Sequence, residues 1–373
     1  ISGLVPGTYF YTVKNISSDC VSIASSNVVI ANQPFTPSTP NIISPQFFVT
    51  GAKVGDLATP SGNIKWYLVP NGGAVLNPLT SLVSGNYYAS ETLGSCESSR
   101  FQTLITVDAP TNGGIVNAVG ASTICSGSSA SLKLTGYVGS VIKWQSSVDN
   151  STWIDILSTS SIDTYSTPNL TSSLYYRAVV QSGVSSIEYS LPAFITVNAP
   201  SNAGTLSPLS SAICKNTTGG TITLNGNNGI VIKWQKSTDG GSVWTDITGT
   251  ANTTSYLVPA LTMSTLFRAV VQNGVCAQVA TTSPATITVK DTPVIPILTN
   301  QLACIGETKS FGTTPQNSAY DYVWTSNRRT LTNNLLSTIS ILFDQAYQED
   351  ITLTISPKDN TNTCVVSGTF SVS

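Results

Sequence analysis

The chain repeats itself with a period of about ninety residues. Residues 141–146 read VIKWQS and return at 231–236 as VIKWQK. Residues 176–184, YRAVVQSGV, likewise return at 267–275 as FRAVVQNGV. A repeat of this length is a small domain and not one rung of a solenoid. The chain is therefore predicted to be an array of similar modules, an organisation that favours spanning distance or presenting surfaces.

Proline and small polar residues mark the junctions between the predicted modules, as at Pro110, Pro200 and Pro293. Proline fixes φ and restricts the residue before it, so these linkers are expected to be short and stiff. The chain opens on what reads as a late strand, and we expect an interior piece of a longer protein. The predicted modules, called one to five below, are the C-terminal part of a module at 1–33 and complete modules at 34–108, 109–198, 199–291 and 292–373.

Apolar and polar residues alternate with a period of two in each complete module, as in 221–224 (TITL), 286–289 (TITV) and 351–355 (ITLTI). This period is typical of half-buried strands. Seven or so short strands in roughly 80–90 residues indicate an immunoglobulin-like sandwich. The predicted fold class is all-β, with tandem immunoglobulin-like β-sandwich modules that form an elongated rod.

Each complete module carries a tryptophan in the middle of a predicted strand. An aromatic side chain of this size dominates the core of a small sandwich, and a sugar-stacking platform is the alternative. Segments 4–11, 82–88 and 170–176 place tyrosines after a leucine and a short turn, which predicts tyrosine corners. The predicted core tryptophans are Trp66, Trp144, Trp234 and Trp324.

Modules four and five share a Cys…Trp…Cys spacing, because Trp234 and Trp324 each follow a cysteine by 20 residues. The shared spacing predicts one disulfide inside each module. Disulfides imply export to an oxidising compartment. The predicted pairs are Cys214–Cys276 and Cys304–Cys364.

The other three cysteines, Cys20, Cys96 and Cys125, have no evident partner in their own modules. Ser185 stands where module three would carry the partner of Cys125, so Cys125 is predicted to be free. The partner of Cys20 is expected upstream of the chain. A Cys96–Cys125 bridge across the junction between modules two and three remains an alternative.

Composition excludes several classes of function. The chain has no histidine, which removes Ser-His-Asp and Cys-His catalysis and histidine-ligated metals. Its net charge is −2, without a basic run, so neither nucleic acid nor an anionic membrane surface is an expected partner. No membrane insertion is expected either. We therefore predict no enzyme activity, cofactor, catalytic residue or metal ligand, and leave open calcium at the junctions through Asp108 and Asp291.

The modules resemble the immunoglobulin-like repeats of giant surface adhesins of Bacteroidota, the type IX secretion cargo that includes SprB-like gliding adhesins. Module two carries the resemblance in 62–67 (GNIKWY), 82–90 (LVSGNYYAS) and 96–100 (CESSR). Module five resembles a PKD-type variant through 322–324 (YVW) and 339–343 (ISILF). The resemblance implies an extracellular protein that is exported by the type IX machinery and attached to the outer membrane.

These observations predict a structural stalk segment of a large secreted cell-surface adhesin that supports surface attachment and gliding motility. Surface glycans or other surfaces would then be bound by regions outside this fragment. The alternative is a set of glycan- or protein-binding accessory modules of a secreted hydrolase.

Overall fold

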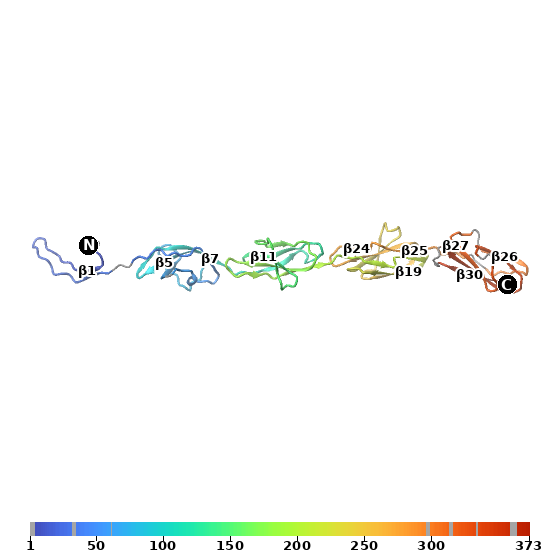
Figure 1. Cartoon of the computed structure of the whole chain (residues 1–373), viewed down its shortest axis with the longest axis horizontal. Helices are drawn as coiled ribbons and strands as arrows, with labels where there is room; N and C mark the ends of the chain where they lie inside the picture. The colour runs from blue at the N-terminus through green and yellow to red at the C-terminus, as the bar shows by residue number, and fades with distance from the viewer. Residues whose placement is uncertain are drawn as a thin grey trace. The chain divides into compact units, whose positions relative to one another are not determined.

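The fold is all-β, in tandem immunoglobulin-like sandwich modules (Figure 1). Valine, isoleucine, threonine and aromatic residues supply the strands, as their preference for pleated surfaces requires. The described residues hold no helix that could span a membrane. The predicted boundary between Gln33 and Pro34 lies outside them. The computed structural model describes residues 4–31, 35–60, 62–295, 299–312, 316–332, 335–358 and 364–373.

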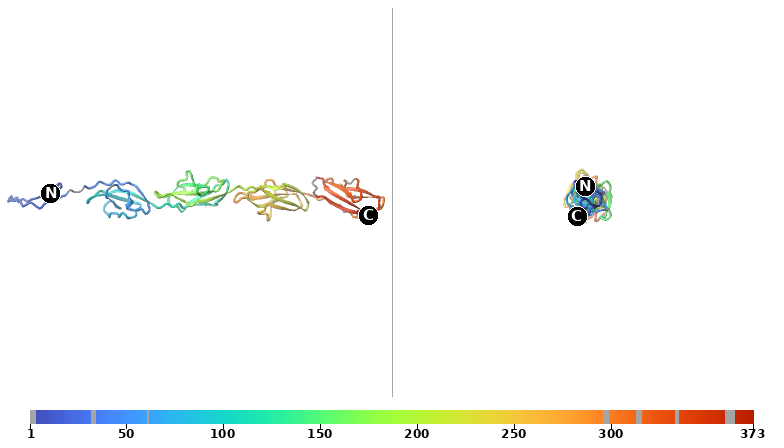
Figure 2. Two further views of the ribbon diagram at one scale, coloured as in Figure 1. Left: turned by 60° about the horizontal axis from the view of Figure 1, so that its bottom comes forward. Right: turned by 90° about the vertical axis from the view of Figure 1, so that its left-hand side faces the viewer.

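The chain divides into two compact units. The first holds modules one and two with most of module three. The second holds modules four and five together with residues 123–128, 169–172 and 196–198 of module three. Figure 2 shows the sheets of the modules from two further sides.

In the described residues, modules one and two have fewer regular strands than modules three and four. In module two the order β3-β7-β5-β4 forms one sheet, with β6 added to β5 and β3 parallel to β7. A 3-10 helix, η1, contributes Val54 to the core that this sheet covers. Module one contributes β1 (Gly7–Tyr9) and β2 (Val28–Ile30). Module two contributes β3 (Gln46–Val49), η1 (Val54–Asp56), β4 (Ile64–Tyr67), β5 (Gly85–Leu93), β6 (Cys96–Glu97) and β7 (Phe101–Asp108).

Module three is a sandwich of two sheets. One sheet has the order β13-β10-β8, and the other has the order β12-β11-β14-β16-β9 with β15 added to β14. Strand β9 runs parallel to the last strand, β16. The strands are β8 (Ile115–Val119), β9 (Thr123–Cys125), β10 (Ser131–Thr135), β11 (Ser140–Ser147), β12 (Ile154–Ile156), β13 (Thr164–Ser166), β14 (Leu174–Gln181), β15 (Glu188–Tyr189) and β16 (Ala193–Asn198).

Module four repeats this plan, with sheets β17-β19-β22 and β18-β25-β23-β20-β21 and with β24 added to β23. Even an irregularity recurs, because β11 shifts register between Val141 and Lys143 and β20 shifts between Val231 and Lys233. The strands are β17 (Thr205–Ser207), β18 (Ser210–Cys214), β19 (Thr217–Asn225), β20 (Ile230–Ser237), β21 (Thr245–Ile247), β22 (Ser255–Leu261), β23 (Thr265–Gln272), β24 (Val279–Ala280) and β25 (Ala285–Lys290).

Module five has two smaller sheets, β26-β28 and β27-β29-β30. Ile351, Leu353 and Ile355 alternate along β29 and all point into the core, as the period-two pattern predicts. The strands are β26 (Glu307–Gly312), β27 (Tyr320–Ser326), β28 (Thr338–Phe343), β29 (Glu349–Pro357) and β30 (Val366–Val372).

The four predicted core tryptophans, Trp66, Trp144, Trp234 and Trp324, are all buried. The indole N–H groups of the last three donate to backbone carbonyls at 2.9–3.0 Å, so burial leaves no donor unsatisfied. Trp144 and Trp234 also stack on a tyrosine in each case, with ring centroids 5.7 and 5.6 Å apart. Trp144, Trp234 and Trp324 therefore pack between the two sheets of their modules.

Two of the predicted tyrosine corners close on the backbone. The Tyr87 hydroxyl donates to the Val83 carbonyl at 3.3 Å, and the Tyr9 hydroxyl donates to the Val5 carbonyl at 2.5 Å. In module three Tyr176 is buried instead against Tyr165, and burial raises the pKa of Tyr176 to about 12.

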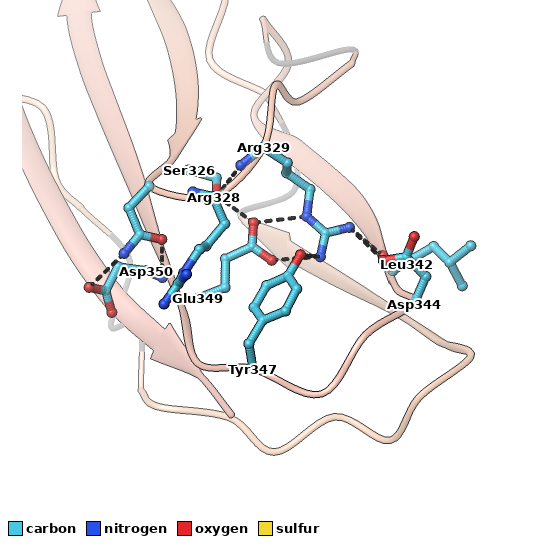
Figure 3. A network of polar contacts seen from close by, with 9 residues as sticks. Ser326, Arg328, Arg329, Leu342, Asp344, Tyr347, Glu349 and Asp350 are labelled. Carbon is cyan, nitrogen blue, oxygen red and sulfur yellow. Dashed lines mark hydrogen bonds and ion pairs between the residues drawn. The ribbon is translucent and has the colours of Figure 1, made fainter.

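A charged pair lies in the wall of module five (Figure 3). Glu349 has no exposed surface, and the Arg329 guanidinium meets both of its carboxylate oxygens, with Nε at 3.0 Å and Nη2 at 2.9 Å. The remaining donors of Arg329 reach the Leu342 carbonyl at 2.9 Å and the Tyr347 hydroxyl at 2.5 Å. The Ser326 hydroxyl donates to the same carboxylate. The hydrogen bonds of the carboxylate fall on Oε1, and Oε2 has only the ion pair with Arg329. The acid and its arginine join the loops around β27, β28 and β29.

Replacing the core tryptophan of module four tests its structural role. Trp234→Ala should destabilise the module by about 3–5 kcal/mol, because it leaves a cavity between the sheets. That loss is comparable to the whole stability of a small domain. Limited proteolysis should then cut within 199–291 and spare the other modules. The control is Trp244→Ala, since Trp244 is only partly buried and its loss should leave the module resistant. Resistance of Trp234→Ala equal to wild type would contradict a core role.

Breaking the buried pair in module five is expected to be costly. Arg329→Met leaves the Glu349 carboxylate buried without its cation, which costs about 3–5 kcal/mol. Lys309→Met is the matched control, because Lys309 and Glu307 form a partly exposed surface pair worth about 0–1 kcal/mol. Chemical denaturation followed by tryptophan fluorescence measures both, and equal midpoints for the two variants would disprove the distinction.

Candidate functional site at the module junctions

In modules three and four, the strand that ends in VVQ is followed by a turn, called the F–G turn here (residues 182–185 after β14 and 273–276 after β23). It contacts the last residue of the preceding module and the first residues of its own module. At the junction of modules two and three, the Val184 N–H donates to the Asp108 carboxylate at 3.3 Å. The Ser182 N–H donates to the Thr111 hydroxyl at 3.0 Å. The Ser185 hydroxyl reaches the Ala109 carbonyl at 3.4 Å.

The junction of modules three and four repeats these contacts with different side chains. The Val275 N–H donates to the Asn198 amide oxygen at 3.2 Å, and the Asn273 N–H donates to the Ser201 hydroxyl at 2.9 Å. The Asn273 amide also donates to the Ala199 carbonyl at 2.9 Å. Because the same backbone groups are used, the F–G turn is a repeated device that holds one module on the next.

Each of these turns requires a glycine. Gly183 and Gly274 have φ values of 49° and 52°, which glycine adopts without steric cost. A Cβ atom at Gly183 would collide with the Asp108 carboxylate, and one at Gly274 would collide with the Asn198 amide. The close approach of turn and side chain thus depends on the absence of a Cβ atom.

Two disulfides cross the junctions, and they differ from the predicted ones. The structure pairs Cys125 with Cys276 and Cys214 with Cys364, with Cα–Cα distances of 4.9 and 5.3 Å. The predicted Cys214–Cys276 and Cys304–Cys364 pairs are therefore wrong, and so is the prediction that Cys125 is free. Cys304 has a free thiol in the described structure. The alternative Cys96–Cys125 bridge is also wrong, because Cys125 is bonded to Cys276.

The reason is that the two cysteines of module four lie at opposite ends of the sandwich. Cys214 ends β18 and pairs in register with Lys290, the last residue of β25. Cys276 follows β23, which is antiparallel to β25, and its sulfur lies 3.3 Å from the Ala199 carbonyl oxygen at the start of the module. The Cys…Trp…Cys spacing alone does not reveal this separation.

The junction of modules two and three lacks both cysteines together. Val49 pairs with Asp108 in the register in which Cys125 pairs with Asn198. Ser185 occupies the F–G turn position that Cys276 holds in module four, since each donates its N–H to the residue three positions before it. Both cysteine positions of the disulfide are therefore occupied by other residues at this junction, while its hydrogen bonds are kept.

The two carboxylates considered for calcium have other partners. Asp108 accepts the Val184 N–H, and Asp291 forms an ion pair with Lys215 at 3.4 Å. Among the described residues no group of three or more histidine, cysteine, aspartate or glutamate side chains is placed to hold a metal ion.

A hollow of about 800 Å³ lies beside the start of module three. Backbone and small side chains make up most of its wall, and Glu188 supplies its carboxylate. Glycoside hydrolysis commonly uses a pair of carboxylates, which the lining residues do not provide.

A polar ladder crosses the larger sheet of module three. Lys143 pairs with Asp155 at 2.6 Å, and the Gln145 amide donates to the same carboxylate at 2.7 Å. The Arg177 Nε donates to the Gln145 carbonyl oxygen at 2.7 Å. The hydrogen bonds from Gln145 and Lys143 lower the pKa of Asp155. Module four repeats the ladder with Lys233, Asp246, Gln235 and Arg268.

The ladder ends on aromatic rings. The Arg177 guanidinium lies 4.1 Å from the ring centroid of Trp153 and 3.9 Å from that of Tyr189. Arg268 lies 4.1 Å from the ring centroid of Trp244. Sequence reasoning assigned these arginines no role, although an arginine recurs at the same place in both copies of the repeat. The guanidinium covers a ring face on which a sugar would otherwise stack.

Adding the missing cysteines to the junction of modules two and three tests the equivalence of the junctions. Val49→Cys with Ser185→Cys should form a third disulfide under mild oxidation and stabilise the fold by about 2–4 kcal/mol. Peptide mapping without reduction detects the cross-linked peptide, and each single variant is the control. If the thiols introduced at positions 49 and 185 stay reduced while the Cys125–Cys276 disulfide forms, the two junctions do not share one geometry.

A family model described as "Domain of unknown function (DUF8696)" matches residues 112–199 and again residues 202–291. The two matches fall on modules three and four, which are thus two copies of one type of domain. No curated protein matches the chain.

Similar solved structures include several chains of many domains. The Ca²⁺-stabilized adhesin that "helps an Antarctic bacterium reach out and bind ice" is 14% identical with a TM-score of 0.32, over 83% of this chain and 90% of its own. Immunoglobulin domains 1–5 of Sidekick-1 are 13% identical with a TM-score of 0.30, over 99% and 86%. A marsupial T cell receptor is 12% identical with a TM-score of 0.35, over 68% and 99%. Likeness at this distance does not specify a function.

Proposed function

We propose that this chain is a structural stalk segment of a large secreted cell-surface adhesin. The observation that carries the proposal is the joining of successive modules by F–G turn contacts and by disulfides from one module to the next. A catalytic domain gains little from such joints. A segment that must transmit force and keep a ligand-binding end away from the cell gains stiffness from each of them.

In this proposal the modules lie end to end as an elongated rod. Each sandwich adds roughly 40 Å, from strands of about ten residues at about 3.3 Å per residue plus a junction. Proline at the junctions and the glycine-dependent turn contacts limit bending. The modules are then spacers, and surface glycans or other surfaces are bound by regions outside this segment.

The disulfides support an extracellular location, because such bonds persist in oxidising compartments. The resemblance to Bacteroidota surface repeats extends the proposal to export by the type IX machinery, attachment to the outer membrane and a part in gliding motility. A glycan-binding accessory role in a secreted hydrolase is less favoured, because Arg177 and Arg268 cover ring faces of Trp153 and Trp244.

Small-angle scattering of the full chain tests the stalk. Four complete modules in line give a radius of gyration of at least about 45 Å, whereas a compact globule of this length has about 21 Å. The Gly183→Ala and Gly274→Ala variants should bend more easily, because each disturbs a turn contact. A value near that of the compact globule, or binding of the full chain to a glycan array, would overturn the proposal.

A further inference from the structure

The two disulfides close covalent loops that overlap. Cys125–Cys276 encloses residues 126–275, and Cys214–Cys364 encloses residues 215–363. Residues 215–275, the greater part of module four, belong to both loops. Two overlapping loops constrain the extension of the chain differently from two loops in series.

We propose that these disulfides limit how far the stalk can be extended under tension, a role that rests on the proposed stalk function. The shortest covalent route from Cys125 to Cys364 crosses to Cys276, runs back along module four to Cys214, and crosses again to Cys364. That route contains roughly 60 residues, which span at most about 205–225 Å. Without disulfides the same two points are joined by roughly 240 residues, which span about 790–860 Å.

The load is therefore directed through one module. On the limiting route the tension passes through β19 to β23, which include Trp234 and much of the core of module four. Strands β10 to β16 of module three and β26 to β29 of module five lie off this route, so tension between Cys125 and Cys364 does not extend them fully. A module that opens under load is kept close to its neighbours and can refold there.

The burial of one cysteine in each disulfide hinders reduction of the bond. Cys276 is 2% exposed and Cys364 is 6% exposed, while their partners Cys125 and Cys214 are partly buried, so a thiol in solution has restricted access to each disulfide. Thiol–disulfide exchange requires direct attack on a sulfur atom, which burial hinders. The junction of modules two and three has Val49 and Ser185 in place of the cysteines and is not braced in this way.

Single-molecule stretching of the full chain, held at its two ends, tests the limiter. Four proteins are compared: wild type, C125S/C276S, C214S/C364S, and the variant with all four serines. Either double variant leaves a shortest route of roughly 90 residues between positions 125 and 364, about 290–320 Å. Removing one disulfide should thus lengthen the fully stretched chain by about 90 Å, and removing both by about 580–640 Å. This strong non-additivity is the signature of overlapping loops.

The control is C20S/C304S, which keeps both disulfides and should stretch to the wild-type length. Dithiothreitol added to the stretched wild type should release the length of the four-serine variant. Contour length depends on covalent connectivity, so the comparison holds even where a variant folds poorly. Full extension of the wild type without reductant would overturn the limiter, and so would gains from the two double variants that sum to the gain of the four-serine variant. A compact particle in scattering would instead overturn the stalk itself, whatever the stretching shows.

Discussion

The parallel pairing of a short early strand with the last strand of its module is the constraint on which the junctions depend. In module four β18 runs beside β25 in the same direction, so Cys214 arrives at the C-terminal end of the sandwich. The antiparallel strand β23 returns toward the N-terminal end and places the F–G turn there. Modules three and four therefore each have one half of a joint at either end, and a cysteine in one half bonds to a cysteine of the neighbouring module.

Few charges are needed for this architecture, and many of those present are used in pairs. Charged residues make up only 9% of the chain, so desolvation of ions is a small part of the cost of folding. Where a charge is buried, as at Glu349, an arginine pairs with it and a hydroxyl donates to it. On the sheet faces of modules three and four, the lysine–aspartate–glutamine–arginine ladders connect neighbouring strands and cover the tryptophans beside them. These groups hold the surface of each sandwich in one arrangement.

Much of the interior was predictable because it follows local rules. A tryptophan within an alternating strand has to be buried between two sheets, and Trp144, Trp234 and Trp324 are. The ladders were harder to predict, since Arg177 is one charged residue in an otherwise apolar strand. Its role depends on Gln145, which lies on β11, and on Trp153, which directly precedes β12. The repetition of all three residues in module four was the available signal.

The repeat length, the period-two alternation and the tryptophans were sufficient to assign tandem sandwiches, because burial of apolar faces depends on patterns within a few residues. The partners of the cysteines were not accessible in this way. Cys214 and Cys276 are compatible in spacing with a bond inside module four, and only strand direction separates them. Which end of a sandwich a residue reaches depends on the order and sense of strands that are distant in the chain. That arrangement is a property of the folded sheets. Because of it, cysteines that were predicted to bond within one module bond between neighbouring modules instead.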